Sequence, residues 1–108
     1  MKINVGSNYS KPKRTFYAIR LAILNALSSG QQTINQIAVK AGINWRTVEL
    51  HLTYFSGKGF VREIFSSQYV RIFIITDKGA EALKKEIEKL RAKLVVENTK
   101  LETKLESG

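Results

Sequence analysis

The chain of 108 residues contains no cysteine, one histidine and one proline. Without cysteine it has no disulfide framework, no zinc finger and no thiol nucleophile. It also lacks a phosphate-cradling glycine loop and a pair of carboxylates beside a cleft-forming pattern, which argues against an enzyme. No apolar run approaches the roughly 20 residues that a membrane span needs, and the N-terminus lacks the apolar segment of a signal peptide. We therefore expect a soluble cytoplasmic protein with no metal ion, cofactor or membrane partner.

Acidic side chains are scarce in the first two thirds of the chain. The formal net charge is +9, and residues 1–76 carry ten lysines and arginines but only two acids, Glu49 and Glu63. Residues 77–108 carry eight basic and seven acidic side chains, so nearly all of the excess lies before them. A basic excess of this kind is typical of domains that bind a polyanion, although it also occurs on surfaces that have no partner.

The middle of the chain predicts two short helices joined by a tight turn. Thr33 and Gln36 form a capping box at the start of the first helix, and Gly42 stands where its end favours left-handed backbone. Asn44 can cap the second helix, which we expect over residues 44–57. At helical spacing, one side of that helix is apolar (Val48, Leu52, Phe55) and the opposite side is open (Arg46, Leu50, Thr53). This is the pattern of a helix-turn-helix whose second helix can enter a DNA major groove.

Further elements are predicted on both sides of this motif. An amphipathic helix precedes it over residues 15–29, and the breaker cluster 56–59 ends its second helix. Two β-rich runs, 60–65 and 69–75, follow and are separated by a short polar segment, which predicts a hairpin that serves as a wing. The expected organisation is a flexible basic arm (1–14), a winged helix-turn-helix domain (15–76) and a C-terminal helix (77–108).

The C-terminal helix predicts a dimer. Thr76 and the residues after it form its cap, and the helix continues without proline or glycine to about Glu106. An apolar seam follows heptad spacing and then shifts its register after Leu94, where Val95 offers the next apolar side chain. We expect a homodimeric coiled coil, parallel or antiparallel, in which Asn98 sets the register or marks a fraying end. The expected interface residues are Leu83, Ile87, Leu90, Leu94, Asn98, Leu101 and Leu105. The fold class is α+β, mostly α, with a three-helix core, a two-stranded wing and a long C-terminal coiled-coil helix.

Two stretches resemble a known family. Residues 47–61 read T-V-x-x-H-L-x-x-F-x-x-x-G-F-V, and residues 75–79 read I-T-D-K-G. Over roughly residues 15–80 the chain resembles winged helix-turn-helix transcriptional regulators of prokaryotes. With its terminal coiled-coil helix, it is similar to the ten-kilodalton winged-helix DNA-binding proteins of archaea and to small regulators of archaeal viruses. The resemblance implies a dimer that binds duplex DNA, and the absence of cysteine sets it apart from metal-sensing branches.

The open face of the second helix holds the base-reading candidates. Arg46 can read the two acceptors of guanine, or it contacts a phosphate without reading sequence. Glu49 can accept from cytosine or else repels phosphate, and Leu50 and Thr53 can meet thymine methyl groups. His51 borders the apolar stripe, and we interpret it as structural or phosphate-contacting rather than as a ligand for a metal ion. The base-reading candidates are Trp45, which can instead pack at the helix edge, Arg46, Thr47, Glu49, Leu50 and Thr53.

A second set would contact phosphates or belong to the wing and would position the protein without reading bases. Its members are Lys11, Lys13, Arg14, Asn44, Tyr54, Lys58, Arg62, Ser66, Ser67, Gln68 and Arg71. The function that we expect is a homodimeric, sequence-reading regulator that binds double-stranded DNA. It would lie in the cytoplasm, associated with the nucleoid, or in a host cytoplasm if the protein is viral. The alternatives are a nonspecific chromatin-like DNA binder and a winged-helix module for protein interaction.

Overall fold

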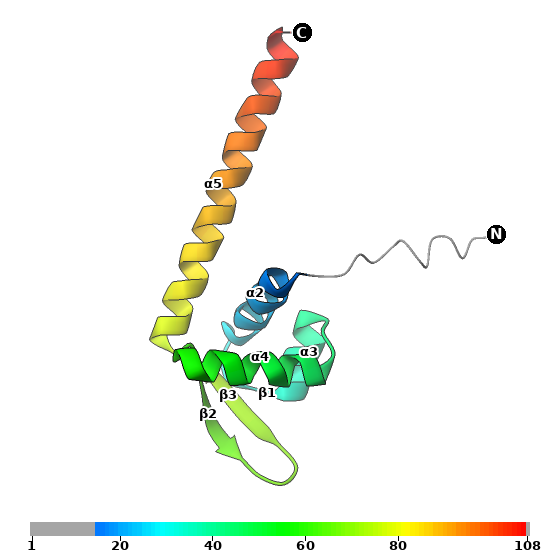
Figure 1. The fold of residues 1–108 in the computed structure, drawn as a ribbon, viewed down its shortest axis with the longest axis vertical. Coiled ribbons are helices and arrows are strands. Elements are labelled where there is room, and N and C mark those ends of the chain that lie inside the picture. The colour runs from blue at the N-terminus through cyan, green and yellow to red at the C-terminus, as the bar shows by residue number, and fades with distance from the viewer. Residues whose placement is uncertain (1–14, 108) are drawn as a thin grey trace, which may run out of the picture.

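A computed structural model describes the backbone of residues 15–107 and the side chains of residues 15–99. Three short helices and a small sheet form the body; the hairpin projects from one end of it, and the long last helix leaves in the other direction (Figure 1). Within the described residues, no helix is long and apolar enough to cross a membrane. The elements are α2 (Phe16–Leu27), β1 (Gln32–Thr33), α3 (Ile34–Ala41), α4 (Trp45–Lys58), β2 (Val61–Ser66), β3 (Arg71–Ile75) and α5 (Asp77–Ser107).

Local capping signals set the ends of the helix-turn-helix, as predicted. The capping box of Thr33 and Gln36 is present at α3, and Asn44 caps α4 by accepting from the backbone N–H of Arg46 at 2.8 Å. Gly42 ends α3 with a φ of 67°, which lies in the left-handed region that favours glycine. These interactions join residues at most three apart and are therefore visible in the sequence.

The predicted breaker cluster 56–59 ends α4, one residue beyond the predicted bound at 57. The helix continues through Ser56 and Gly57 to Lys58, and Gly59 ends it with a φ of 78°. A glycine inside a helix costs about 1 kcal/mol relative to alanine but does not forbid helical backbone. Because Val48, Leu52 and Phe55 bury one side of α4 in the core, packing outweighs that cost.

The core draws on nearly every element of the body. Phe55 and Phe73 are its largest fully buried side chains. The amphipathic helix predicted over residues 15–29 is present as α2, but Phe16 at its start is 70% exposed and lies outside the core. The buried apolar residues are Ile23, Leu24, Ala26, Leu27, Ile37, Ala41, Val48, Leu52, Phe55, Val61, Phe73 and Leu83.

The sheet has three antiparallel strands in the order β1-β3-β2. Strands β2 and β3 form the predicted hairpin, and β1 is a third strand that was not predicted. The additional strand, β1, pairs with Phe73 and Ile72 of β3. Its two residues are too few to show the alternation by which a strand is recognised in a sequence. The loop of the hairpin is residues 67–70 rather than the predicted 66–68, because Ser66 still pairs with Arg71.

The start of α5 is fixed against the turn between α4 and β2. The hydroxyl of Thr76 donates to the carbonyl of Gly59 at 2.6 Å, and its N–H donates to the carbonyl of Phe60 at 2.9 Å. The same hydroxyl accepts from the N–H of Gly79 at 3.1 Å. Thr76 is therefore the predicted cap of the last helix and also its attachment to the body.

The first turns of α5 belong to the body, which changes the predicted dimer seam. Leu83 is 7% exposed and lies in the core of the winged-helix body, and Ile87 packs against that core. Tyr17 of α2 also donates to the carboxylate of Glu86 at 2.6 Å. Leu83 and Ile87 thus have partners within the chain, and the part of α5 without such packing among the described side chains begins near Leu90, which is 39% exposed.

Candidate nucleic-acid interface

The side of α4 that faces away from the core is open. Arg46 and Thr53 are exposed, and Leu50 is 69% exposed although it is apolar. At 100° per residue these three side chains lie nearly opposite the buried Val48 and Leu52. The hydroxyl of Thr53 donates back to the carbonyl of Glu49 in the preceding turn. The structure thus brings three of the base-reading candidates onto one exposed strip.

Trp45 and Thr47 flank this strip at the first turn of α4. Trp45 is 49% exposed, and the guanidinium of Arg46 lies 5.7 Å from the centroid of its ring. Thr47 is half-buried, and Asn44 uses its side chain as the cap. Trp45 therefore does not pack into the core, and it offers an aromatic face beside the Arg46 guanidinium.

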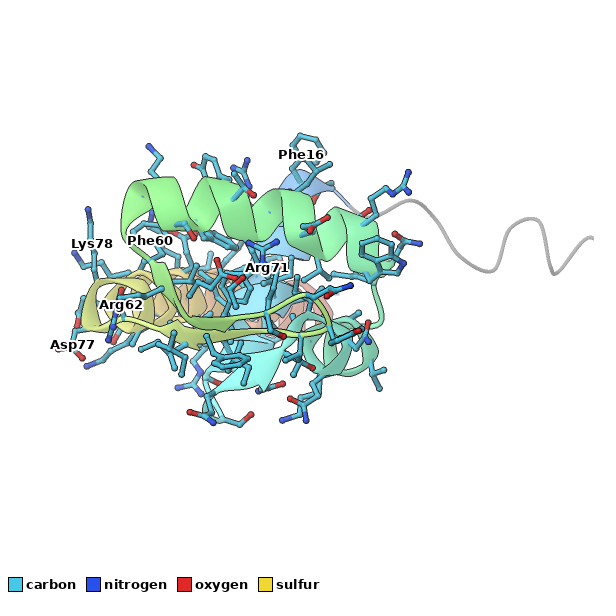
Figure 2. All side chains as sticks on the ribbon, turned by 90° about the horizontal axis from the view of Figure 1, so that it is seen from below. Phe16, Phe60, Arg62, Arg71, Asp77 and Lys78 are labelled. Atoms are coloured by element: carbon cyan, nitrogen blue, oxygen red, sulfur yellow. The ribbon has the colours of Figure 1, made fainter. Side chains whose placement is uncertain are left out.

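An ion-pair cluster joins α4 to the wing. The guanidinium of Arg71 donates to both carboxylate oxygens of Glu63, at 2.6 and 3.2 Å, and to the carboxylate of Glu49 at 3.0 Å. In Figure 2, Arg71 lies between α4 and the strands. The hydrogen bonds from Arg71 lower the pKa of Glu63 below its ordinary value, and those to Glu63 raise the pKa of Arg71. The sequence led us to expect that Glu49 accepts from cytosine or repels phosphate and that Arg71 contacts phosphate. In the structure these two side chains bind each other.

A second cluster joins α4 to α2 and centres on Arg20, which the sequence had not singled out. Its guanidinium lies 3.7 Å from the ring centroid of Tyr54, and its Nε donates to Nδ1 of His51 at 3.4 Å. The ring of Phe16 meets His51 edge-on at 5.4 Å. His51 is 7% exposed, so it is a buried structural residue, and Tyr54 is held by a cation–π contact. Arg20 is the one charged residue of α2, and nothing in the sequence near it indicates that it would contact His51 and Tyr54.

This cluster predicts a pH dependence of stability. Burial, and then the charge of Arg20, lower the pKa of His51 below its ordinary 6.5. Below about pH 6.5 the unfolded chain therefore takes up a proton that the folded protein resists, so the free energy of unfolding should fall as the pH drops from there to the folded pKa. Urea unfolding at about pH 7.5 and pH 5.5 measures this change.

His51→Gln is the matched variant for this measurement. It should show a smaller fall in stability over the same interval, since it removes the titrating group. Glu63 and Glu86 have pKa values lowered from 4.5 and lose their stabilising effect only at lower pH. An equal fall in the variant and the wild type would assign the pH dependence to other groups.

The wing tip carries no cation. Ser67 shapes the loop, because its hydroxyl accepts from the backbone N–H groups of Tyr69 and Val70 at 3.2 and 3.1 Å. Gln68 is exposed, and Tyr69, which was not among the sequence candidates, is 89% exposed. A hollow of about 370 Å³ lies between this loop and the first turns of α3 and α4, with Trp45, Glu49 and Arg71 in its lining.

The other phosphate candidates are not gathered at one place. On β3, Arg71 and Phe73 face α4 and the core. Successive side chains of a strand point to opposite faces of the sheet, so Ile74 faces away from α4. Arg62 is paired with Ile74 across the hairpin and therefore lies on that same face. Figure 2 shows Arg62 near Asp77, at the α5 end of the sheet. Lys58 lies at the end of α4, with its ammonium 5.7 Å from the Tyr54 ring. Ser66 is exposed at the end of β2, and three candidates lie outside the described residues: Lys11, Lys13 and Arg14.

No group of three or more His, Asp or Glu side chains that could hold a metal ion occurs in the described part of the chain. On α5, Leu94, Val95 and Val96 are 58%, 63% and 52% exposed, and Asn98 is also exposed. The side chains of Leu101 and Leu105 lie outside the described residues.

A family model described as winged helix-turn-helix matches residues 13–94. No curated protein sequence matches the chain. Among solved structures, the DNA-binding protein Sso10a-2 from Sulfolobus solfataricus is similar at 25% identity and a TM-score of 0.63, covering 82% of this chain and 93% of that one.

Two transcriptional regulators share the fold at lower identity. BldR from Sulfolobus solfataricus is 24% identical with a TM-score of 0.64, and the match covers 84% of this chain and 63% of BldR, so this chain spans less than two thirds of it. The repressor CouR, solved with a 23-mer DNA duplex, is 22% identical with a TM-score of 0.56, covering 63% of this chain and 50% of that one. The resemblance in architecture to archaeal winged-helix proteins, expected from the sequence, is confirmed.

Proposed function

The chain belongs to the winged helix-turn-helix family, and from this premise we propose that it is a transcriptional regulator that binds double-stranded DNA as a homodimer, with α4 in the major groove. The observation that carries this proposal is the exposed strip of Arg46, Leu50 and Thr53 opposite the buried side of α4. A helix fits the major groove of B-DNA, and base edges there present distinct patterns of donors, acceptors and methyl groups. The protein would act on DNA in the cytoplasm.

The chemistry of this strip favours sequence reading over uniform coating of DNA. The fork of Arg46 matches the two acceptors of guanine, whereas Leu50 and the methyl group of Thr53 suit thymine methyl groups. A surface that binds phosphates alone would be rich in lysine and arginine. Trp45 and Thr47, beside the strip, are further candidates for base contacts.

The dimer is proposed from α5. Beyond the body, this helix exposes Leu90 and Leu94 on one stripe, and the sequence continues that stripe through Asn98, Leu101 and Leu105. An amphipathic helix that leaves its own core needs another surface for its apolar side. A second copy of α5 offers a matching stripe, and a two-fold dimer would present two α4 helices to half-sites separated by one or more helical turns.

Leu94→Lys should shift the protein from dimer to monomer. A lysine at a seam position exposes a charge to the apolar side of the partner helix, and dimer dissociation should become at least about tenfold easier. Val96→Lys is the control, because Val96 is similarly exposed but lies about 200° around the helix from Leu94. Sedimentation equilibrium measures both. If the two variants remain equally dimeric, α5 does not form the interface through this stripe.

Binding of the wild-type protein to a labelled duplex tests the DNA proposal directly. Fluorescence anisotropy between about 50 and 200 mM salt should show affinity that falls steeply with salt, by about 0.9 in the log–log slope for each phosphate neutralised. Competition with mixed-sequence DNA gives the ratio of specific to nonspecific affinity, which separates a regulator from a chromatin-like binder. Absence of binding at the lowest salt would refute the proposal and favour a module for protein interaction.

A further inference from the structure

Both carboxylates of the winged-helix domain converge on one guanidinium. Among residues 15–76, Glu49 and Glu63 are the only acidic side chains. Glu49 comes from α4 and Glu63 from β2, and both bind Arg71 of β3 at distances of 2.6 to 3.2 Å. These side chains are 41%, 29% and 35% exposed, so the cluster lies at the surface and not in the core.

The cluster lies on the same side of the body as the proposed DNA contacts. Glu49 follows Arg46 by one helical turn, and both Glu49 and Arg71 line the hollow between the wing loop and α4. A free carboxylate at this place would face DNA phosphates and repel them, the more so because nearby protein lowers the local dielectric constant. The two carboxylates together carry two negative charges. With the positive charge of Arg71, the net charge of the cluster is minus one.

The geometry also shows why an arginine is suited to this position. Its planar guanidinium carries five N–H donors, and it reaches two carboxylates from different elements at once. One side of the guanidinium meets both oxygens of Glu63 across the hairpin, and the remaining terminal nitrogen meets Glu49. A lysine ammonium, a point charge, lacks this bidentate geometry.

We propose that Arg71 is a positioning residue for DNA binding: it holds Glu49 and Glu63 against the sheet and neutralises them, while other residues contact the DNA. This inference rests on the proposed function and assigns new roles to the three residues. Glu49 is then an anchor for the wing and does not read a base. Arg71 acts through the two glutamates and does not act as a phosphate ligand.

Arg71→Met tests the proposal together with the triple variant Arg71→Met, Glu49→Gln, Glu63→Gln. The single variant frees both carboxylates and should weaken duplex binding about tenfold near 100 mM salt. The triple variant has no carboxylate left to neutralise, so its affinity should return to within about threefold of the wild type, with the same salt slope. Circular dichroism and thermal unfolding confirm that each variant is folded.

Two results would overturn the proposal. If the triple variant stays as weak as Arg71→Met and its log–log salt slope is shallower by about 0.9, Arg71 is itself a phosphate ligand. If it stays weak with the wild-type slope, the contribution of Arg71 is the placement of the wing alone and not the neutralisation of charge. Absence of DNA binding by the wild-type protein would instead refute the proposed function.

Glu49→Gln supplies a second test that keeps Arg71 and its contact with Glu63 in place. Removing one carboxylate takes the net charge of the cluster from minus one to zero, so the variant should bind a duplex about two- to fivefold more tightly at low salt. Weaker binding would contradict the proposed neutralisation, because it would show that the Glu49 carboxylate supports DNA binding more than its charge opposes it.

Discussion

Gly79→Ala should destabilise the protein by about 3 kcal/mol or more, although the same change stabilises most helices. A Cβ at Gly79 would overlap the carbonyl oxygen of Phe60. It would also lie 2.9 Å from the carbonyl carbon of Phe60 and 2.9 Å from Cγ1 of Ile75. The obstacle is mainly backbone, which cannot move aside as a flexible side chain can. That carbonyl also accepts the N–H of Thr76 at 2.9 Å, so displacing it would weaken the attachment of α5 to the body.

Thermal unfolding measures the effect, and Gly57→Ala is the control. A drop of about 3 kcal/mol corresponds to a fall in Tm of roughly 12 °C or more for a domain of this size. Gly57 is also helical, but apart from its chain neighbours and the backbone of its own helix no atom lies within 4 Å of a Cβ added there. Alanine at that position should raise stability by about 0.5 kcal/mol through helix propensity alone. Wild-type stability in Gly79→Ala would mean that α5 does not approach Phe60 this closely.

The close approach at Gly79 gives a physical reason for the motif I-T-D-K-G. In that motif, Thr76 caps the helix and bonds to the turn after α4, and only glycine leaves room for the Phe60 carbonyl three residues later. The sequence predicted the cap because its donors and acceptors are local. It could not predict the close contact, which depends on where the chain 19 residues earlier is placed.

Much of the remaining fold was also predictable because it depends on local interactions. Apolar spacing revealed the helices, and Gly42 marked the end of α3, because these signals depend on near neighbours. The predictions failed where packing outweighs a local signal. Leu83, expected in a dimer seam, lies in the core of the chain itself, where the first turns of α5 pack beside α2.

In the candidate site, too, the local features were predictable from the sequence and the long-range contacts were not. The exposed strip of α4 follows from helical periodicity, so Arg46 and Leu50 were correctly placed on one face. The charged clusters do not follow from it, since Arg71 meets Glu49 from 22 residues away and Arg20 meets His51 from 31 residues away. The sequence alone therefore does not distinguish a basic side chain that is available to bind phosphate from one that is paired with a residue distant in the sequence.

Arg46→Ala should weaken binding to a duplex about 10- to 100-fold, the largest loss that we expect from any exposed side chain of α4. Arg46 lies in the first turn of the helix, where side chains reach base edges in helix-turn-helix complexes. Among the described residues, no carboxylate forms an ion pair with it, and its guanidinium lies beside the exposed Trp45 ring. Binding of Arg46 to DNA would therefore break no internal ion pair. Fluorescence anisotropy with a labelled duplex measures the loss.

Arg62→Ala is the control that separates a groove contact from a general effect of charge. Both variants lose one positive charge, but Arg62 lies on the face of the sheet away from α4. If α4 enters the groove, Arg62→Ala should change affinity by less than about threefold, because it affects only the long-range field, which salt screens. Equal losses in the two variants would contradict the groove assignment, because they would show that affinity follows net charge and not the position of Arg46 on α4. A loss in Arg46→Ala that disappears on a duplex in which one guanine is replaced would show further that Arg46 reads that base.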